Sequence, residues 1–141
     1  MDHILHKVVG ETIISTMDGL SGYNQVAMHP YDMEKTTFTT PWGRFMYNNM
    51  PFGLINAGAT FQCATGIAFV GENYKLIVIY LDDMTIYSTS DMDHLKHLRH
   101  TFFKCRKYGL SLNPNKSYFA MEEGKLLGHI VSKDGVKIDH E

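Results

Sequence analysis

The strongest structural signal in the sequence is the segment Leu76-Ile77-Val78-Ile79-Tyr80-Leu81-Asp82-Asp83-Met84-Thr85-Ile86-Tyr87-Ser88. β-Branched and aromatic residues lead into two adjacent aspartates, and a second β-prone run follows at once. This pattern predicts a β-hairpin with Asp82 and Asp83 at its tip. Two neighbouring carboxylates repel each other and are costly to bury without a compensating charge. The hairpin is therefore a candidate seat for a divalent cation, although aspartate is also common in plain polar turns.

Length and composition are those of one ordinary globular domain. The chain has 141 residues, 44% of them apolar and 20% charged, which is enough for a real hydrophobic core. Its longest apolar run, residues 76–81, is too short to span a bilayer, and we expect no membrane partner. Cys63 and Cys105 show no metal-binding spacing and are expected to be free thiols of an intracellular protein. The net charge of −2 gives no whole-chain argument for nucleic-acid binding.

The first half of the chain predicts short strands followed by a helix. We expect a short helix over 1–10, a strand over 12–17 that ends at Asp18, an extended segment over 24–29, a loop over 30–34, and strands over 36–40 and 44–50. A helix over 57–70 follows, with Asn56 as its N-cap. Its inner stripe is expected to be Phe61, Ala64 and Ala68.

The second half predicts a long helix over 91–108, capped by Ser90 and stopped by Gly109. Its buried face is expected to carry Leu95, Leu98, Phe102 and Cys105. Short strands are expected over 110–112, 118–120, 125–127 and 130–132, with turns at 113–115 and 133–135. Strands and helices alternate without regular βαβ units, which favours an α+β sheet with helices on one face.

The helix over 91–108 also carries histidines and basic side chains. His94, His97 and His100 follow a three-residue spacing, but no cysteine or carboxylate partner has a suitable spacing, so an exposed, solvated face is expected rather than a metal site. The basic side chains could touch a phosphate backbone, and an exposed helix face explains them equally well. They are Lys96, Arg99, Lys104, Arg106 and Lys107.

Three aspartates lie at the ends of strand-like runs: Asp18, Asp82 and Asp83. If the first strand lies beside the hairpin, the three carboxylates converge on one point of the sheet rim. Hard oxygen ligands suit Mg²⁺, which takes its remaining ligands from water and substrate phosphates. Two such ions about 3.5–4 Å apart would stabilise the attacking and leaving oxygens of a phosphoryl displacement.

Six blocks, in order and over nearly the whole chain, resemble the reverse transcriptase of gypsy-class LTR retrotransposons, with plant elements most similar. Met17-Asp18-Gly19-Leu20-Ser21-Gly22-Tyr23-Asn24-Gln25-Val26 is similar to the family's first aspartate block, and Tyr80-Leu81-Asp82-Asp83 to its paired-aspartate block. Between them lie Lys35-Thr36-Thr37-Phe38 with Pro41-Trp42-Gly43, and the most specific block, Met50-Pro51-Phe52-Gly53-Leu54 with Asn56-Ala57-Gly58-Ala59-Thr60-Phe61-Gln62. The last two are Gly109-Leu110-Ser111-Leu112-Asn113-Pro114-Asn115-Lys116 and Leu127-Gly128-His129-Ile130-Val131-Ser132. Gly58 stands where the wider family more often has proline.

The resemblance implies a palm-type antiparallel sheet and RNA- and DNA-directed DNA synthesis with two Mg²⁺ ions, for which Mn²⁺ is a possible substitute. Asp18, Asp82 and Asp83 would be the metal ligands, and Lys116 would protonate the departing pyrophosphate. Tyr23 would lie under the incoming sugar and exclude a ribose 2′-hydroxyl. The nucleotide site would also include Gly19, Leu20, Ser21, Gly22, Phe52, Gly53 and Gln62, and the primer grip would be Leu127, Gly128 and His129.

By the same resemblance, the partners would be an RNA or DNA template, a DNA primer and dNTP. Most of the fingers, the thumb and the RNase H domain of such an enzyme are absent from these 141 residues. We therefore expect a partial domain from a retrotransposon polyprotein. By the same resemblance, it would act in virus-like particles in the cytoplasm, with the nucleus as a second location. Three alternatives stay open at this stage: an inactive nucleic-acid-binding remnant, a pararetroviral polymerase fragment, and an unrelated metal-dependent phosphohydrolase.

Overall fold

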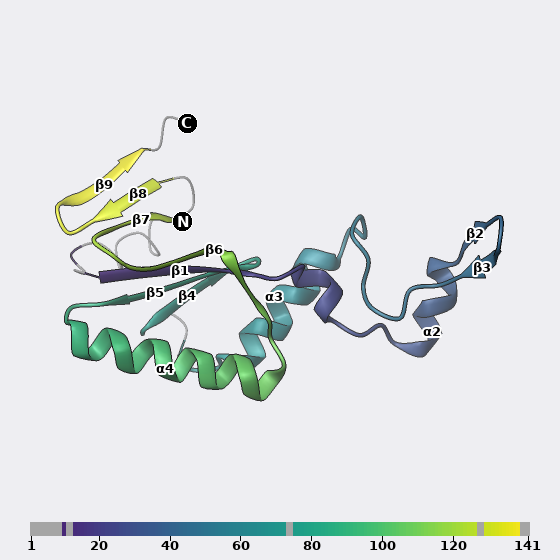
Figure 1. Ribbon diagram of the computed structural model, residues 1–141, viewed down its shortest axis with the longest axis horizontal. Coiled ribbons are helices and arrows are strands. Elements are labelled where there is room, and N and C mark those ends of the chain that lie inside the picture. The colour runs from purple at the N-terminus through teal and green to yellow at the C-terminus, as the bar shows by residue number, and fades with distance from the viewer. Residues whose placement is uncertain (1–9, 11–12, 73–74, 127–128, 139–141) are drawn as a thin grey trace.

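The computed structural model describes residues 10, 13–72, 75–126 and 129–138. Its centre is an antiparallel sheet with strand order β4-β5-β1-β6 (Figure 1). The strands are β4 (Ile77–Tyr80), β5 (Asp83–Ser88), β1 (Ile13–Gly19) and β6 (Leu112–Met121). β1 therefore lies between the predicted hairpin and a strand from the C-terminal half of the chain.

The predicted hairpin is formed by β4 and β5. Tyr80 pairs with Asp83, so that Leu81 and Asp82 make the turn. Leu81 takes a left-handed φ of 55°, because a connection this tight needs a positive φ to follow the twist of the strands. Alternation along both strands then directs Ile77, Ile79, Met84 and Ile86 to one face of the sheet.

Helices α3 (Ala57–Ala68) and α4 (Asp91–Tyr108) cover that face (Figure 1). α4 has the predicted bounds: the backbone N–H of Asp93 donates to the Ser90 hydroxyl, and Gly109 ends the helix with a φ of 68°. Asn56 is the N-cap residue of α3, but its side chain makes no capping hydrogen bond. The enclosed core contains Met17, Ala68, Phe69, Ile77, Met84, Ile86 and Cys105. The predicted α+β class, with helices on one face, is confirmed.

A second sheet covers the opposite face (Figure 1). It consists of β7 (Glu123–Leu126), β8 (His129–Ser132) and β9 (Gly135–Ile138), in that order. Its Leu126 and Val131 pack on Ile14, Val78 and Tyr87 of the central sheet. The turn predicted at 133–135 joins β8 to β9, a strand that the sequence did not predict.

Residues 26–56 form an arm that extends away from the central sheet (Figure 1). The two predicted strands are present as β2 (Phe38–Thr40) and β3 (Gly43–Phe45), although β3 ends five residues before the predicted limit at 50. Beyond β3, the chain returns to the sheet through an isolated bridge between Asn49 and Ala27. Nearly every residue from 41 to 49 is exposed, so too little apolar surface is buried there to extend the strand.

Two predictions for residues 22–34 are wrong. The expected loop over 30–34 contains the helix α2 (Pro30–Met33), followed by the 3₁₀ turn η2 (Glu34–Thr36). Pro30 lies in the first turn, where a missing N–H costs nothing, and the N–H of Tyr31 donates to Nδ1 of His29. The extended segment expected over 24–29 begins instead as the 3₁₀ turn η1 (Gly22–Gln25).

The turn predicted at 113–115 is also wrong, because these residues lie inside β6. The predicted strands 110–112 and 118–120 are parts of this longer strand, which pairs with β1 through two register shifts. β6 is the edge strand of the sheet, so Pro114 interrupts no ladder on its outer side. The shifts absorb the turn-forming residues as bulges instead of reversing the chain.

The buried face of α4 differs from the prediction. Leu98 and Cys105 face the sheet, but Leu95 is 62% exposed and Phe102 is 40% exposed. His94, Thr101 and Cys105 are the buried positions, so the inner stripe is rotated about one residue from the expected one. The expectation of a solvated histidine face is wrong for His94, which is 2% exposed. Its Nε2 lies 2.7 Å from the Ser15 hydroxyl, and its Nδ1 lies 3.2 Å from that of Ser88.

Several remaining expectations concern single residues or the ends of the chain. Cys63 and Cys105 are free, as predicted, and burial raises the pKa of the Cys105 thiol to about 11. The helix expected over 1–10 lies outside the described residues except for Gly10, and so do Leu127 and Gly128. In the described part of the chain, no helix is both long enough and apolar enough to cross a membrane.

Candidate active site

Strand pairing brings Asp18 and Asp83 together. β1 and β5 are antiparallel neighbours, and Asp18 and Asp83 are directly opposite partners in their register. Directly opposed side chains lie on the same face of a sheet, about 4.5–5.5 Å apart at Cβ. This is the face that carries β7 and β8, not the face covered by the helices. The convergence predicted for these two strand-end carboxylates is therefore present.

Asp82 joins them from the hairpin turn. Its carbonyl oxygen accepts a hydrogen bond of 2.9 Å from the N–H of Gly19, the residue after Asp18. A Cβ placed on Gly22 would lie 3.3 Å from the Cβ of Asp82. The third carboxylate is thus held beside the end of β1 and the loop that follows it, as predicted.

The electrostatics of this cluster are those of crowded like charges. The pKa of the Asp83 carboxyl is raised, first by the partial loss of contact with water and then by the charges of Asp82 and Asp18. Lys116 opposes this rise, and its Nζ lies 3.7 Å from Oδ2 of Asp18. Lys116 belongs to the edge strand β6 and its side chain is 71% exposed, so it neutralises the cluster only in part.

The donor chemistry of the cluster fits a divalent cation. Carboxylate oxygens are the ligands that Mg²⁺ prefers. The pKa of Asp83 is raised by burial first and then by the charges of Asp82 and Asp18, and such an ion would offset these charges. Among the described residues, no group of three His, Cys, Asp or Glu side chains is arranged so that the group alone could hold a metal ion. Mg²⁺ does not require one, because it keeps several waters and takes substrate phosphates as ligands.

An aromatic cluster borders the carboxylates on the side of the arm. The ring of Tyr23 meets Phe52 edge-to-face at 5.6 Å and Phe61 at 6.2 Å between centroids. Phe61 is 1% exposed and supports Tyr23 from beneath, whereas Phe52 is 64% exposed. A Cβ on Gly19 or Gly22 would lie 3.3 or 3.2 Å from the Phe61 ring, so the loop between β1 and η1 packs tightly against that ring. Phe61 was predicted only as a core residue of the helix, and no signal in the sequence indicated its contact with Tyr23.

The other predicted nucleotide-site residues lie around this cluster. Ser21 has a left-handed φ of 50° and is the N-cap residue of η1, and Leu20 is 45% exposed. Gly53 follows Phe52 with a φ of 91°, a backbone conformation that residues other than glycine rarely adopt. Gln62 is exposed on α3, beside Phe61 in the sequence. Gly58 lies behind Tyr23, since a Cβ there would be 3.7 Å from the tyrosine hydroxyl.

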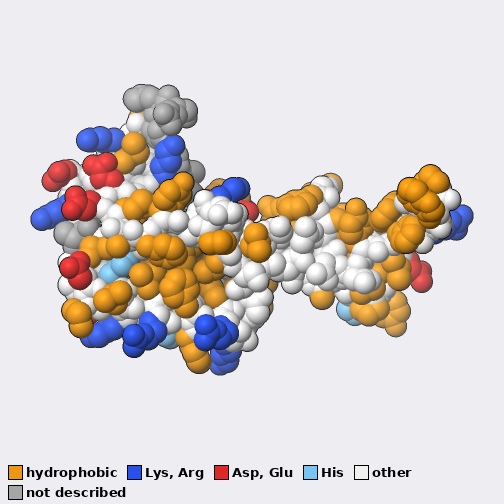
Figure 2. Space-filling view, viewed as in Figure 1, with side chains coloured by type: hydrophobic (Ala, Val, Ile, Leu, Met, Phe, Trp, Pro, Cys, Tyr) orange, Lys and Arg blue, Asp and Glu red, His pale blue; other side chains and the backbone are white. Residues whose placement is uncertain are grey.

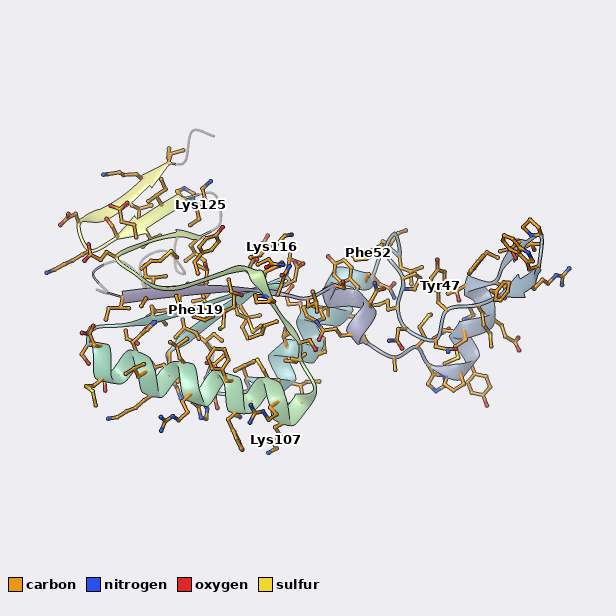
Figure 3. All side chains as sticks on the ribbon, viewed as in Figure 1. Tyr47, Phe52, Lys107, Lys116, Phe119 and Lys125 are labelled. Carbon is orange, nitrogen blue, oxygen red and sulfur yellow. The ribbon has the colours of Figure 1, made fainter. Side chains whose placement is uncertain are left out.

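A cleft of about 450 Å³ runs from the carboxylates toward β7. Its walls include Thr16, Thr85, Asp83, Lys116, Tyr118 and Lys125. Figure 3 shows Lys116 between Lys125 of β7 and Phe52 near the base of the arm. Of the predicted primer-grip residues, only His129 is described, as the first residue of β8. The structure thus places β7 beside the cleft, with β8 paired to β7.

The sequence and the fold have close relatives. A family model described as reverse transcriptase (RNA-dependent DNA polymerase) matches residues 2–131. The chain is 41% identical over 138 residues to the retrovirus-related Pol polyprotein from transposon 297 of Drosophila melanogaster, and 37% identical over 139 residues to that from transposon gypsy. These matches cover 97% and 98% of this chain but only 13% of each relative.

Solved structures share the fold. The foamy viral protease-reverse transcriptase in complex with RNA/DNA hybrid matches 96% of this chain with a TM-score of 0.84 and 23% identity. A second structure of that protein, in complex with double-stranded DNA, matches with a TM-score of 0.87 and 24% identity. The chain covers 18% and 24% of those two chains. The likeness extends over the central sheet, its helices and the arm together.

Proposed function

Because the chain belongs to the reverse transcriptase family, we propose that it carries the catalytic centre of an RNA-directed and DNA-directed DNA polymerase that replicates a gypsy-class retrotransposon. The reaction joins a dNTP to a primer 3′-hydroxyl and releases pyrophosphate. One observation carries this proposal: Asp18 and Asp83 face each other across neighbouring strands, with Asp82 in the adjoining turn. That arrangement gathers hard oxygen ligands at an open sheet rim, where a substrate triphosphate has access.

The proposed metal ligands are Asp18, Asp82 and Asp83. Two Mg²⁺ ions, or Mn²⁺ in their place, would supply Lewis-acid stabilisation of the attacking and leaving oxygens. The raised pKa of Asp83 supports this assignment, because the protein gathers charge there without neutralising it. The contact of Lys116 with Asp18 is long and the lysine side chain is 71% exposed, so a cation could take the place of the ammonium group.

Lys116 is the proposed general acid for the leaving pyrophosphate. Its ammonium group donates hydrogen bonds only and lies at the rim of the carboxylate cluster, 3.7 Å from Asp18. Since the side chain is 71% exposed, it is long and free enough to follow a departing phosphate. A positioned acid of this kind contributes typically 10²–10⁴-fold to rate.

Tyr23 is the proposed residue that excludes ribonucleotides. Its ring meets Phe52 and the buried Phe61 edge-to-face, so a 2′-hydroxyl against its face would meet a ring that Phe61 supports. The backbone of Gly19, Leu20, Ser21 and Gly22 would lie near the triphosphate. The N–H groups of Gly19 and Leu20 already donate to the carbonyls of Asp82 and Ser111, so N–H contacts would come from Ser21 and Gly22. Phe52, Gly53 and Gln62 would complete the pocket, and Leu127, Gly128 and His129 the primer grip.

The proposed partners are an RNA or DNA template, a DNA primer and dNTP, for which the cleft between Asp83 and Lys125 offers a binding surface. We further propose that the chain is part of a larger polyprotein, in which it forms the palm and part of the fingers. The chain spans about an eighth of the curated relatives it matches, and the arm exposes Tyr31, Phe38, Trp42 and Phe45, which more fingers residues would cover. For that polyprotein we propose virus-like particles in the cytoplasm as the place of action, with the nucleus as a second.

The test is primer extension by the longer polymerase that contains this chain. Asp82→Asn and Asp83→Asn should each abolish templated dNTP incorporation, because a neutral amide is a poor ligand for Mg²⁺. Asp134→Asn, an exposed acid in the turn between β8 and β9, is the matched control and should keep full activity. Retained extension by Asp83→Asn would remove this residue from the mechanism.

A second measurement needs no activity. Mg²⁺ should raise the melting temperature of the wild-type chain by binding the folded state, and the rise should be absent in Asp83→Asn. The isolated 141-residue chain is expected to give no primer extension, because the remaining fingers and the thumb are needed to hold the duplex. Templated incorporation by the isolated chain would contradict this last expectation.

A further inference from the structure

The side chain of Gln25 makes three hydrogen bonds near the end of β1, the strand that carries Asp18. Its Nε2 donates to the carbonyl oxygens of Leu20, at 2.7 Å, and of Ser111, at 2.9 Å. Its Oε1 accepts from the N–H of Ser111 at 2.7 Å. A primary amide can donate two hydrogen bonds and accept two, so three of its four possibilities are used on backbone groups of two distant segments.

These two segments carry different parts of the proposed site. Leu20 lies in the loop between β1 and η1, two residues after Asp18, and Ser111 lies just before β6, the strand that carries Lys116. One backbone bond already joins them, since the N–H of Leu20 donates to the Ser111 carbonyl at 2.9 Å. The same loop is joined to the hairpin turn, because the N–H of Gly19 donates to the carbonyl of Asp82. The loop therefore joins three parts of the proposed site: the strand of Asp18, the hairpin turn of Asp82 and the strand of Lys116.

Gln25 is the side chain that closes this junction. The other two joints are backbone hydrogen bonds, which every residue except proline can make. The hydrogen bonds of the Gln25 side chain, in contrast, can be made only by a planar group of this length that both donates and accepts. Gln25 is half-buried at the end of η1, and the left-handed Ser21 begins that turn, so the chain doubles back to bring the amide onto its own loop.

We infer that Gln25 is a positioning residue for the incoming nucleotide. It fixes the backbone of the loop over 19–22, which is proposed to receive the triphosphate, relative to the strand of Lys116, which is proposed to protonate its leaving group. Gln25 itself touches neither the carboxylates nor the reacting atoms. The inference rests on the proposed polymerase function and adds to it a residue for which the sequence had indicated no role.

Three substitutions separate the hydrogen bonds from the shape of the side chain. Gln25→Met keeps the length and the flexible stem and removes all three hydrogen bonds. Gln25→Glu keeps an acceptor for the Ser111 N–H but sets a carboxylate oxygen against the carbonyls of Leu20 and Ser111. Asn24→Ala is the matched control, because it removes an exposed amide from the neighbouring position of the same turn.

In the longer polymerase, Gln25→Met and Gln25→Glu should each raise the KM for dNTP by about tenfold, which corresponds to about 1.4 kcal/mol of lost binding free energy. The kcat at saturating dNTP and the KM for primer–template should change little, and Asn24→Ala should match the wild type in all three. A role in stability alone would lower the melting temperature or the fraction of active enzyme and leave the KM for dNTP unchanged. An unchanged KM in both Gln25 variants overturns the inference.

Amide hydrogen exchange on the 141-residue chain gives a readout that does not depend on activity. The Ser111 amide should exchange faster in Gln25→Met than in the wild type or in Asn24→Ala, and equal exchange overturns the inference. If the wild-type polymerase extends no primer, the proposed function fails and the inference fails with it. If the wild type and Asn24→Ala extend normally while the Gln25 variants keep their KM, only the inference fails.

Discussion

At the scale of single residues, Asp83, a proposed metal ligand, lowers the stability of the fold at neutral pH. Burial and the charges of Asp82 and Asp18 raise its pKa, so the folded chain holds this proton more tightly than the unfolded chain does. Stability therefore falls as pH rises from the ordinary aspartate value near 3.9 through the raised folded value, and the full penalty remains at neutral pH. A protein that needed only stability would carry no charge here.

Asp83→Asn should consequently make the fold more stable at pH 7 while it abolishes activity. The gain should shrink in acid, where Asp83 of the wild-type chain is already protonated. Urea unfolding of both chains at pH 7 and near pH 3.5, without divalent cations, measures this difference. Asp134→Asn, which changes an exposed acid, should leave the urea midpoint almost unchanged at either pH. A loss of stability in Asp83→Asn at pH 7 would contradict the electrostatic account.

At the scale of elements, two glycines should respond in opposite ways to one added methyl group. β7 approaches β1 closely at one of them, whereas the other lies in α3 beside open space. A Cβ on Gly124 would lie 2.7 Å from Cγ2 of Ile14, whereas a Cβ on Gly66 of α3 would meet nothing within 4 Å. Gly124→Ala should destabilise the chain by about 1–3 kcal/mol through overpacking. Gly66→Ala should stabilise it by about 0.5–1 kcal/mol, since glycine is unfavourable inside a helix. Thermal or urea unfolding of the two variants tests the pair, and a stable Gly124→Ala would show that β7 yields easily.

α4 is fixed to the sheet by buried polar contacts as well as by apolar packing. His94 contacts the hydroxyls of Ser15 in β1 and Ser88 in β5, and the Ser15 hydroxyl also accepts from the N–H of Ala120 in β6. Burial, and to a lesser degree the charge of His97, lowers the pKa of His94. As pH falls, the unfolded chain therefore binds a proton at His94 before the folded chain does. The contribution of His94 to stability is fully present above about pH 6.5 and declines as pH falls below that value.

His94→Gln should flatten this dependence, because the amide can still make hydrogen bonds but does not titrate. Unfolding of the wild type and the variant between pH 5 and pH 8 gives the measurement. The wild type should lose more stability than the variant as the pH falls. His100→Gln is a useful comparison, since His100 is 42% exposed and pairs with Glu72 at the far side of the helix. Parallel curves for wild type and His94→Gln would contradict the account.

Local signals in the sequence predicted elements well where they were complete. Ser90 and Gly109 fixed both ends of α4, and the Asp82-Asp83 hairpin followed from its own residues. The inner stripe of α4 was missed because His94 satisfies its polar ring through Ser15, which lies 79 residues away in the chain. Asn113-Pro114-Asn115 resembled a turn because its neighbours in β1 are invisible in the sequence. The amide of Gln25 was missed for the same reason, since both of its partners are set by the fold.

At the scale of the whole molecule, hydrophobic surface is unevenly distributed. The central sheet buries side chains on both faces, whereas the arm leaves Tyr31 84% and Trp42 87% exposed. Figure 2 shows hydrophobic side chains gathered at the free end of the arm. Phe38 packs mainly on Phe45 and Tyr47 of its own hairpin, at ring-centroid distances of 6.0 and 5.3 Å. A two-stranded hairpin with only such local contacts is marginally stable in water.

The arm should therefore open independently of the central sheet. Amide hydrogen exchange should be fast in β2 and β3 and slow in β1 and β5, because local opening costs little where few apolar contacts are broken. Mass spectrometry of the exchanging 141-residue chain measures this contrast. In the longer polymerase, the same amides of β2 and β3 should become protected if further fingers residues cover them. Equal protection of the arm and the sheet in the isolated chain would contradict the expectation.

The pairing of Asp18 with Asp83 determines where this protein can tolerate insertions and deletions. Side chains alternate along a strand, so one residue inserted before Asp18 in β1 would turn its carboxylate from the open cleft into the face packed by α3 and α4. An insertion of the same size at the tip of the β2–β3 hairpin leaves the facing of both aspartates unchanged. In-frame insertions and deletions should thus be silent for the proposed metal site across most of the arm, yet a single codon gained within β1 or β5 should disrupt that proposed site without changing any of the three aspartates.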